Sequence, residues 1–232
     1  MSTNFNSFYN QKNLVDFFSM TIAKKLEEAI KRRSKATLLV SGGNTPKAFF
    51  EKLRTYDIQW EHVKIALVDE RWVDEKHEDS NAKLVKEYLI KDKASKATFI
   101  PLYQENSNAL DSVEACSSLV KKELFPCDVL ILGMGNDSHT ASIFPNNEKI
   151  EEAIDINNEN YCVSMTPATA KHPRMSLTLS AILKAENIYL QIQGIKKKKV
   201  YEKALREDNF LISPVSAVLN NTKKQIEVYY NE

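Results

Sequence analysis

With 232 residues, 43% of them hydrophobic, the chain is long enough for one α/β domain or two small ones. Its 32 basic and 31 acidic residues give a net charge of +1, which lacks the basic excess of a nucleic-acid-binding protein. No apolar run is as long as a membrane span, and the polar start does not resemble a signal peptide, so a cytoplasmic protein without membrane contact is predicted. The three cysteines form no CxxC pair, which favours buried thiols over disulfides or a metal site.

Helical and strand patterns alternate along the chain. Apolar residues recur at helical spacing through residues 13–33, and the basic residues at the end of this segment suit a helix C-terminus. Short apolar runs typical of buried parallel strands separate the helical segments. The predicted strands are residues 37–40, 63–68, 98–102, 128–132, 161–165, 187–193 and 225–230, and further helices are predicted within 47–53, 84–89, 109–124, 196–205 and 215–219.

Three segments between these elements are less regular. Residues 146–160 are polar and acidic and predict a surface loop or an irregular helix, and residues 167–174 form a proline-bounded loop. Residues 176–183 fit either a strand or a helix. The alternation as a whole predicts one three-layer α/β domain spanning residues 1–232, with a mostly parallel sheet.

A glycine turn follows the strand predicted at 37–40. The run Ser41-Gly42-Gly43-Asn44-Thr45-Pro46 leads directly into a helical pattern, with Pro46 suited to the first helical position and Asn44 or Thr45 to the cap. A strand, a glycine turn and a helix start together can hold an anion on free backbone N–H groups. The alternative is a capped turn whose glycines satisfy only the backbone geometry, and the segment itself does not decide between the two.

Charged residues follow the strand predicted at 63–68. Asp69, Glu70 and Arg71 stand at its carboxyl end, where surface ion pairing is the commoner explanation for charges. His77 and Asp79 come next, and then Ser80 and Asn81, either of which suits the N-cap of the following helix.

The most informative stretch is residues 128–145. An apolar run ends at Gly133 and Gly135, and Asp137, Ser138 and His139 follow at once. Ligands of open α/β sheets bind at the carboxyl ends of the strands, so a site is expected here. The chain has only five glycines, and all of them follow apolar runs, where the backbone must bend or approach a ligand closely.

These motifs resemble, in order and spacing, those of the 6-phosphogluconolactonases, whose broader superfamily includes glucosamine-6-phosphate deaminases. The resemblance covers the chain from about residue 37 to its end. The block around His139 is highly specific, whereas the block at Ser41 is shared with the deaminases. The motifs are Ser41–Pro46, Asp69–Val73 with His77-x-Asp79-Ser80-Asn81, Gly133–Pro145, Pro173-Arg174-x-Ser176–Leu179, and Gly194-x-x-Lys197.

The resemblance implies a modified Rossmann-like fold and hydrolysis of 6-phospho-D-glucono-1,5-lactone, with neither an organic cofactor nor a required metal. It implies that His139 is the general base that activates water, and it matches Asp137 to the family's acidic residue. The phosphosugar lactone would be the only partner, bound by a monomer or weak homo-oligomer. The substrate and phosphate contacts implied are Ser41, Gly42, Gly43, Asn44, Thr45, Asp69, Arg71, Arg174 and Lys197.

The chemistry of a sugar lactone agrees with these roles. The activated ester needs a deprotonated water, stabilisation of the carbonyl oxygen, and a proton returned to the ring oxygen. One histidine can take and return that proton because its ordinary pKa of about 6.5 is close to the working pH. A carboxylate at Asp137 would fix its tautomer, and the backbone N–H groups of residues 133–138 are expected to receive the oxyanion.

Each residue also has a purely structural interpretation. Alone, His139 would more often be a hydrogen-bonded structural histidine, Asp137 an N-cap, Arg174 a surface residue, and Lys196–Lys199 a solvated run. Their joint position at the ends of separate predicted strands, together with the resemblance, favours the catalytic interpretation.

One residue departs from the family pattern, which usually has glycine where this chain has Ser138. If the position requires a positive φ, serine costs about 1–3 kcal/mol of strain and can displace the His139 ring, unless its hydroxyl joins the local hydrogen bonds. This departure leaves a non-catalytic sugar-phosphate-binding protein as one alternative. The other is a deaminase, which would use a glutamate shortly after the histidine, where this chain has Ile143-Phe144-Pro145.

Overall fold

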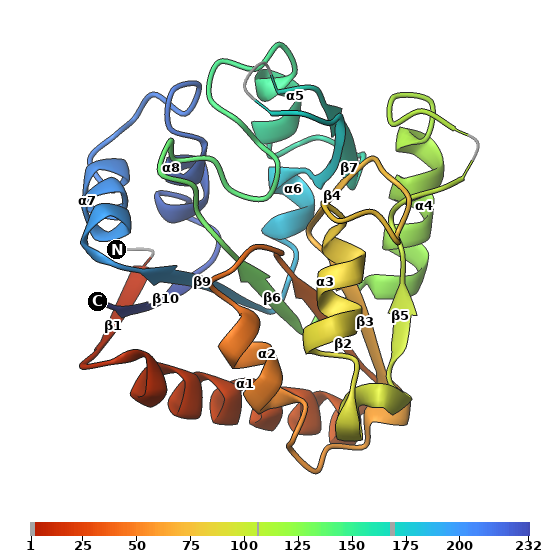
Figure 1. Cartoon of the computed structure of the whole chain (residues 1–232). Coiled ribbons are helices and arrows are strands. Elements are labelled where there is room, and N and C mark those ends of the chain that lie inside the picture. The colour runs from red at the N-terminus through yellow and green to blue at the C-terminus, as the bar shows by residue number, and fades with distance from the viewer. Residues whose placement is uncertain (1–2, 106, 168–169) are drawn as a thin grey trace.

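The computed structural model describes residues 3–105, 107–167 and 170–232. Its centre is a seven-stranded parallel sheet with the strand order β1-β10-β9-β6-β2-β3-β5 (Figure 1). The predicted α/β fold with a mostly parallel sheet is confirmed. The strands are β1 Thr3–Phe8, β2 Ala36–Val40, β3 Val63–Leu67, β5 Thr98–Ile100, β6 Val129–Leu132, β9 Asn187–Gln193 and β10 Ile226–Asn231.

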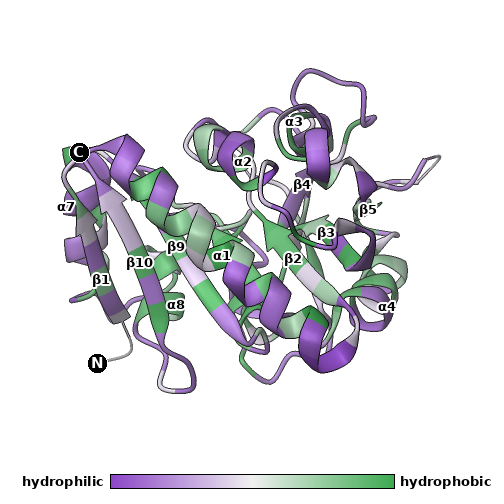
Figure 2. Ribbon diagram, turned by 90° about the horizontal axis from the view of Figure 1, so that it is seen from below, coloured by the Kyte–Doolittle hydropathy of each residue, from purple (hydrophilic) through white to green (hydrophobic). Residues whose placement is uncertain are grey.

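The longest helix, α1 (Gln11–Arg33), crosses one face of this sheet (Figure 2). The side chain of Asn10 accepts a hydrogen bond from the Asn13 N–H and caps the helix start, and basic residues occupy its last turn, as expected. The other helices are α2 Lys47–Leu53, α3 Asn81–Tyr88, α4 Val113–Leu124, α5 Ile150–Ile154, α6 Leu179–Ile182, α7 Ile195–Ala204 and α8 Pro214–Leu219, with 3₁₀ turns η1 Trp60–His62 and η2 Asp92–Lys96.

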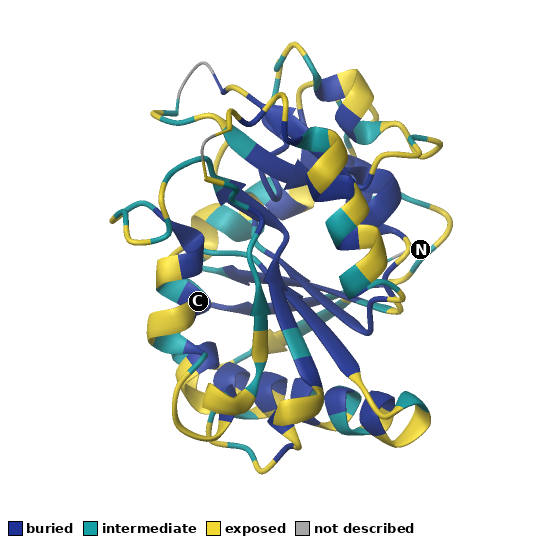
Figure 3. Ribbon diagram, turned by 90° about the vertical axis from the view of Figure 1, so that its right-hand side faces the viewer, coloured by how far each residue is buried: buried dark blue, intermediate teal, exposed yellow. Residues whose placement is uncertain are grey.

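The core lies between the sheet and its helices. The five inner strands of the sheet are buried over most of their length, whereas the edge strands β1 and β5 are not, and the helices are exposed on one side (Figure 3). Phe18 of α1 stacks on Phe49 of α2 at 4.5 Å and on Tyr229 of β10 at 4.4 Å between ring centroids. Burial of one such side chain contributes about 1.5–3 kcal/mol. These contacts fix α1 and α2 on the sheet that carries the glycine turns.

A second, antiparallel sheet has the order β4-β8-β7, with β4 Asp69–Arg71, β8 Arg174–Leu177 and β7 Cys162–Met165. The strand predicted at 161–165 exists but belongs to this small sheet. Residues 69–71 were expected to be the charged carboxyl end of the strand at 63–68. This was wrong, because they form a separate strand that pairs with β8. The Leu177 N–H donates to the Val68 carbonyl at 2.8 Å and joins the small sheet to the end of β3.

Other sequence-based boundaries needed correction. The amino-terminal strand β1 was not predicted, and α4 begins at Val113 instead of residue 109. Within the ambiguous segment 176–183, the chain changes from strand to helix at Thr178, whose side chain caps α6. The predicted loop at 167–174 ends in strand β8, and its residues 168–169 lie outside the described residues. Residues 146–160 contain the short helix α5.

The remaining composition-based predictions concern thiols and membranes. Cys116, Cys127 and Cys162 are buried and free, as predicted. Within the described residues, no helix combines the length and the hydrophobicity needed to cross a membrane.

Candidate active site

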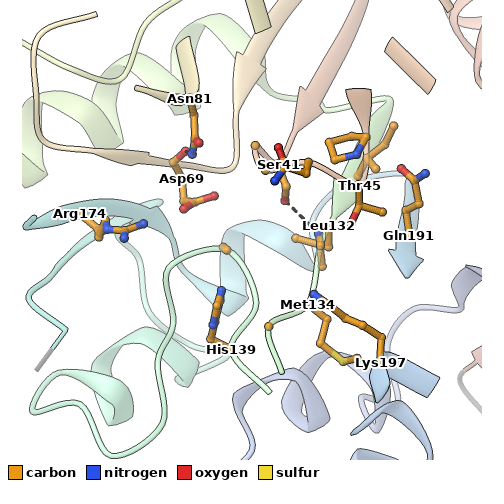
Figure 4. A pocket seen from close by; sticks show the side chains of 18 of the residues that line it. Ser41, Thr45, Asp69, Asn81, Leu132, Met134, His139, Arg174, Gln191 and Lys197 are labelled. Atoms are coloured by element: carbon orange, nitrogen blue, oxygen red, sulfur yellow. Dashed lines mark hydrogen bonds between the residues drawn. The ribbon is translucent and has the colours of Figure 1, made fainter. Parts of the chain in front are cut away.

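A cavity of about 210 Å³ lies at the carboxyl ends of β2 and β6, between the parallel sheet and the small antiparallel sheet (Figure 4). It brings together ten of the eleven residues expected at a site. Asp137 is the exception, since it does not line the cavity but hydrogen-bonds His139, which does. The expected residues that line it are Ser41, Gly42, Gly43, Asn44, Thr45, Asp69, Arg71, His139, Arg174 and Lys197.

The Ser41–Thr45 loop forms one wall of the cavity. Gly42 is needed for close packing, because a Cβ there would lie 2.0 Å from Asn81 Oδ1, and Gly43 has a φ of +94°. The Gly133 N–H donates to Ser41 Oγ at 3.0 Å, which ties this loop to the one after β6.

The expected helix cap at this loop is absent. Pro46 is the N-cap of α2 and not its first helical residue, and the helix has no side-chain cap, so the proposed caps Asn44 and Thr45 were wrong. The Asn44 carbonyl instead accepts the Lys47 N–H at 3.4 Å in a turn. Among the described residues, no group accepts a hydrogen bond from the N–H of Gly43 or Asn44. The loop therefore has donors available for an anion.

The turn after β6 brings His139 to the cavity. The Gly135 N–H donates to the His139 carbonyl at 2.8 Å, and the Ser138 N–H donates to the Gly135 carbonyl at 3.2 Å. The N–H groups of Gly133, Gly135 and Ser138 are thus all used within the protein. Of the N–H groups of residues 133–138 that were expected to receive an oxyanion, these three are therefore not available, because two bond within the turn and one bonds to Ser41.

Gly135 leaves room for the His139–Asp137 pair. A Cβ at this position would lie 2.2 Å from His139 Nδ1 and 2.3 Å from Asp137 Oδ1. His139 Nδ1 lies 2.6 Å from Asp137 Oδ1. Because an ionised carboxylate only accepts hydrogen bonds, Nδ1 carries the proton and Nε2 keeps its lone pair. The hydrogen bond from His139 lowers the pKa of Asp137.

Apolar and serine side chains hold the ring in place. Phe144 stacks on His139 with ring centroids 4.4 Å apart. Ser138 has a φ of +69°, so the position does favour glycine. Its hydroxyl lies 2.5 Å from the Asp137 carbonyl and 3.3 Å from the Ile212 carbonyl, either of which can accept its proton, and its own carbonyl accepts the Val215 N–H at 3.0 Å. These bonds oppose the strain, and the imidazole remains at the cavity.

The small sheet supplies two arginines. Antiparallel pairing places Arg71 of β4 opposite Arg174 of β8, so both guanidinium groups reach the cavity from neighbouring strands. Burial, and after it the neighbouring Arg71, lowers the pKa of Arg174. The Nε atoms of both arginines are buried without a hydrogen-bond partner among the described residues. An anion would relieve this electrostatic cost.

Lys197 approaches from the opposite side, in the first turn of α7. Gly194, with a φ of +86°, turns the chain from β9 into this helix. Burial lowers the pKa of Lys197, while the Asp137 carboxylate opposes that shift. Three cations from three separate elements therefore surround the cavity.

Two acidic residues of β4 hold the neighbouring segments. Asp69 Oδ2 accepts a hydrogen bond from the Ser142 hydroxyl at 2.6 Å, which fixes the His139 loop against the small sheet. Glu70 was not expected at the site, and it accepts the N–H groups of Asn81 and Ala82, both at 2.8 Å, at the start of α3. Burial raises the pKa of Glu70 to about 7.

Sequence reasoning missed two buried amides of the cavity wall. Asn81 was considered only as a helix cap, but the cap of α3 is Ser80, whose hydroxyl accepts the Lys83 N–H at 3.2 Å. Asn81 Oδ1 and Gln191 Oε1 are buried without a hydrogen-bond partner among the described residues. The alternating pattern of β9 carried no signal that would single out Gln191.

An imidazole–carboxylate pair beside three cations, at the carboxyl edge of a parallel sheet, defines a site for a small anionic substrate. The comparisons with known proteins agree, since residues 9–228 match the family model described as glucosamine-6-phosphate isomerases/6-phosphogluconolactonase. The chain belongs to this family.

Its relatives are similar over nearly their whole length. A 6-phosphogluconolactonase from Rhizobium meliloti is 36% identical over 230 residues and covers 99% of both chains. One from Neisseria meningitidis is 41% identical over 212 residues and covers 91% of both. The crystal structure of a 6-phosphogluconolactonase from Shewanella baltica has a TM-score of 0.95 at 39% identity, covering 99% of this chain and 98% of that one.

The fold is also shared with the other branch of the family. A monomeric glucosamine-6-phosphate deaminase superposes with a TM-score of 0.80 at 14% identity, covering 99% of this chain and 97% of the other. At that identity the likeness shows only the fold, so the chemistry has to be argued from the site.

Proposed function

We propose that this chain hydrolyses 6-phospho-D-glucono-1,5-lactone to 6-phosphogluconate, with His139 as the general base. The observation that carries the proposal is the geometry of His139, whose Nδ1 is held 2.6 Å from Asp137 while its ring lines a cavity surrounded by cations. The names of the relatives that match nearly the full chain support the same substrate.

The reaction follows from this arrangement. His139 Nε2 removes a proton from water as the oxygen attacks the lactone carbonyl carbon, and charge develops on the carbonyl oxygen. When the bond between that carbon and the ring oxygen breaks, the imidazolium returns its proton to the ring oxygen. Asp137 acts as a positioning residue, because it fixes the tautomer and stabilises the imidazolium.

The cations and the glycine loop bind the phosphate and the developing charge. Arg71, Arg174 and Lys197 reach the cavity, and the loop offers the unused N–H groups of Gly43 and Asn44. A dianion compensates the desolvation of buried cations and is bound strongly by guanidinium groups. Its binding energy can hold the lactone beside His139.

The family alternative, deamination of glucosamine 6-phosphate, fits this site less well. The side chain that stacks on the His139 ring is the apolar Phe144, in the stretch where the deaminases place a glutamate. A non-catalytic sugar-phosphate sensor also fits less well, since Ser138 leaves the His139–Asp137 hydrogen bond intact.

The test is lactone hydrolysis by the wild type and by His139→Ala, measured by the acid released and corrected for spontaneous opening. We expect kcat to fall by about 10²–10⁴-fold with little change in phosphate binding, because only the proton transfer is removed. The exposed His62 provides the matched control His62→Ala. Ammonia release from glucosamine 6-phosphate, or binding of 6-phosphogluconate without lactone hydrolysis by the wild type, would contradict the proposal.

A further inference from the structure

A second histidine–carboxylate cluster lies beside the small sheet, outside the cavity. His77 and Asp79 belong to the segment after β4, and His172 lies just before β8. Donor atoms of these three side chains lie within 4.8 Å of one another, and all three residues are half-buried. Since β4 and β8 pair with each other, the two segments that carry the cluster are held side by side.

The donor atoms lie close to one carboxylate oxygen of Asp79. His172 Nε2 lies 2.9 Å from Asp79 Oδ2, and His77 Nδ1 lies 3.9 Å from the same oxygen. His77 Nδ1 accepts the Asp79 N–H at 3.0 Å, so it is the unprotonated ring nitrogen, and a metal ion would take its lone pair in place of that N–H. The two imidazole rings meet edge to face with centroids 5.3 Å apart.

Two imidazoles and one carboxylate form a donor set that suits Zn²⁺ and its neighbours among the transition metals, whereas Mg²⁺ and Ca²⁺ prefer oxygen ligands. Zinc lies about 2.0–2.2 Å from such donors, so donor atoms within 4.8 Å of one another are close to the spacing that one ion requires. Lys171 Nζ, 3.5 Å from Asp79 Oδ2, is the cation that a metal would displace.

A hydrogen-bonded surface pair would explain His172 and Asp79 alone. It leaves His77 Nδ1, which is an unprotonated nitrogen, 3.9 Å from the same carboxylate oxygen, and two acceptors this close together favour a cation between them. The convergence of three donors from two chain segments is what a metal site requires.

The cluster is connected to the arginines of the cavity. The Asp79 carbonyl accepts a hydrogen bond from Arg71 Nη1. His172 is separated from Arg174 by Pro173 alone, and the Pro173 carbonyl accepts the Trp72 N–H at 2.8 Å. An ion that joins the two segments would therefore fix both guanidinium groups.

We propose that His77, Asp79 and His172 bind one divalent transition-metal ion of the zinc class, which holds the segments carrying Arg71 and Arg174 and tightens anion binding in the cavity. The ion takes no part in the hydrolysis. The proposal of a metal site depends only on the geometry of the cluster. The proposed effect of the metal on the affinity for an anion depends also on the proposed function of the cavity.

The first experiment titrates the full, metal-free chain with Zn²⁺ by calorimetry and with Co²⁺ by visible absorption, which reports coordination by histidine. We expect one equivalent to bind, and affinity to fall by at least about tenfold in His77→Gln and in His172→Gln. His62→Gln and His139→Gln should bind as the wild type does. Unchanged affinity in His172→Gln, or loss of binding in His139→Gln, would overturn the site.

The second experiment measures the affinity for inorganic phosphate with and without Zn²⁺. We expect Zn²⁺ to tighten phosphate binding in the wild type and to have no effect in His172→Gln. Equal phosphate affinity with and without zinc in a wild type that binds the metal would overturn the coupling. A chain that binds zinc at the cluster but fails to hydrolyse the lactone would refute the proposed function and leave the metal site standing.

Discussion

The two sheets contribute to the cavity in different ways. The parallel sheet supplies backbone turns, in which Gly42 and Gly135 leave room for Asn81 and for the His139–Asp137 pair and Gly43 adopts a positive φ. The small antiparallel sheet supplies charged side chains, with Arg71 and Arg174 placed by strand register. The position of the proton-transfer residue therefore depends on local turn geometry, whereas the positions of the two arginines depend on pairing between strands that are far apart in the sequence.

The largest effect is expected for a substitution beside His139, in the turn that follows β6 of the parallel sheet. Gly135→Ala would put a methyl group 2.2 Å from His139 Nδ1 and so displace the pair. Because a 1 Å misplacement of catalytic groups can cost about 10²-fold, we expect kcat to fall by about that factor while the chain remains folded. Lactone hydrolysis and circular dichroism would measure the two effects.

The same sheet offers a matched control. Gly133→Ala would place its methyl group 3.8 Å from Ser41 Cβ, an ordinary contact distance. It should keep near-normal activity. Equal losses in both alanine variants would show that the turn, and not the space beside His139, is what matters.

The second-largest effect is expected for Arg174 of the small antiparallel sheet. Removing the guanidinium in Arg174→Ala should raise KM by about ten- to a hundredfold with a smaller change in kcat, because a charge-assisted contact to the anion is lost. Arg174→Lys should recover only part of this loss, since an ammonium cannot bind a phosphate in bidentate fashion. Steady-state kinetics of both variants would measure this. A fall in kcat at unchanged KM would instead assign Arg174 to the chemical step.

The pH dependence of stability separates the two regions, because the pKa of Glu70 in the small sheet is raised, whereas the pKa of Asp137 in the turn after β6 is lowered. Burial raises the pKa of Glu70 from 4.5 to about 7. Between these two values the folded chain keeps a proton that the unfolded chain has released, so this stabilisation is complete below pH 4.5 and is lost as the pH rises towards 7. Urea unfolding across this range should show a falling free energy of unfolding in the wild type and a flatter profile in Glu70→Gln. Parallel profiles would exclude Glu70 as the source.

The smallest effect concerns Ser138 in the parallel-sheet turn. Ser138→Gly removes the strain of a φ of +69° but also the hydroxyl, which bonds to the Asp137 or Ile212 carbonyl. These terms are each about 1 kcal/mol and of opposite sign, so the free energy of unfolding should change by less than about 1 kcal/mol. Ser138→Ala keeps the strain without the hydroxyl and should be destabilised by about 1 kcal/mol. A more stable alanine variant would show that the hydroxyl contributes nothing.

The helices, strands and turns that have a local sequence pattern could be predicted from the sequence alone. The buried strands from 37–40 to 225–230 are apolar runs or alternating segments, α1 has an apolar face, and the turns at Gly42 and Gly135 lie where a chain poor in glycine keeps it. The residues expected at a site follow these strands, and the carboxyl ends of parallel strands meet at one edge, so their convergence could be predicted.

Features that depend on pairing between distant segments could be known only from the tertiary structure. Residues 69–71 carry no apolar run, and they become a strand because β8 lies beside them. The same pairing sets Arg71 against Arg174 and brings His77 and Asp79 to His172. The sequence did not show that three of the backbone N–H groups after β6, those of Gly133, Gly135 and Ser138, bond to protein oxygens. Such contacts join residues that are far apart along the chain, and a local pattern records which groups exist but not which of them meet.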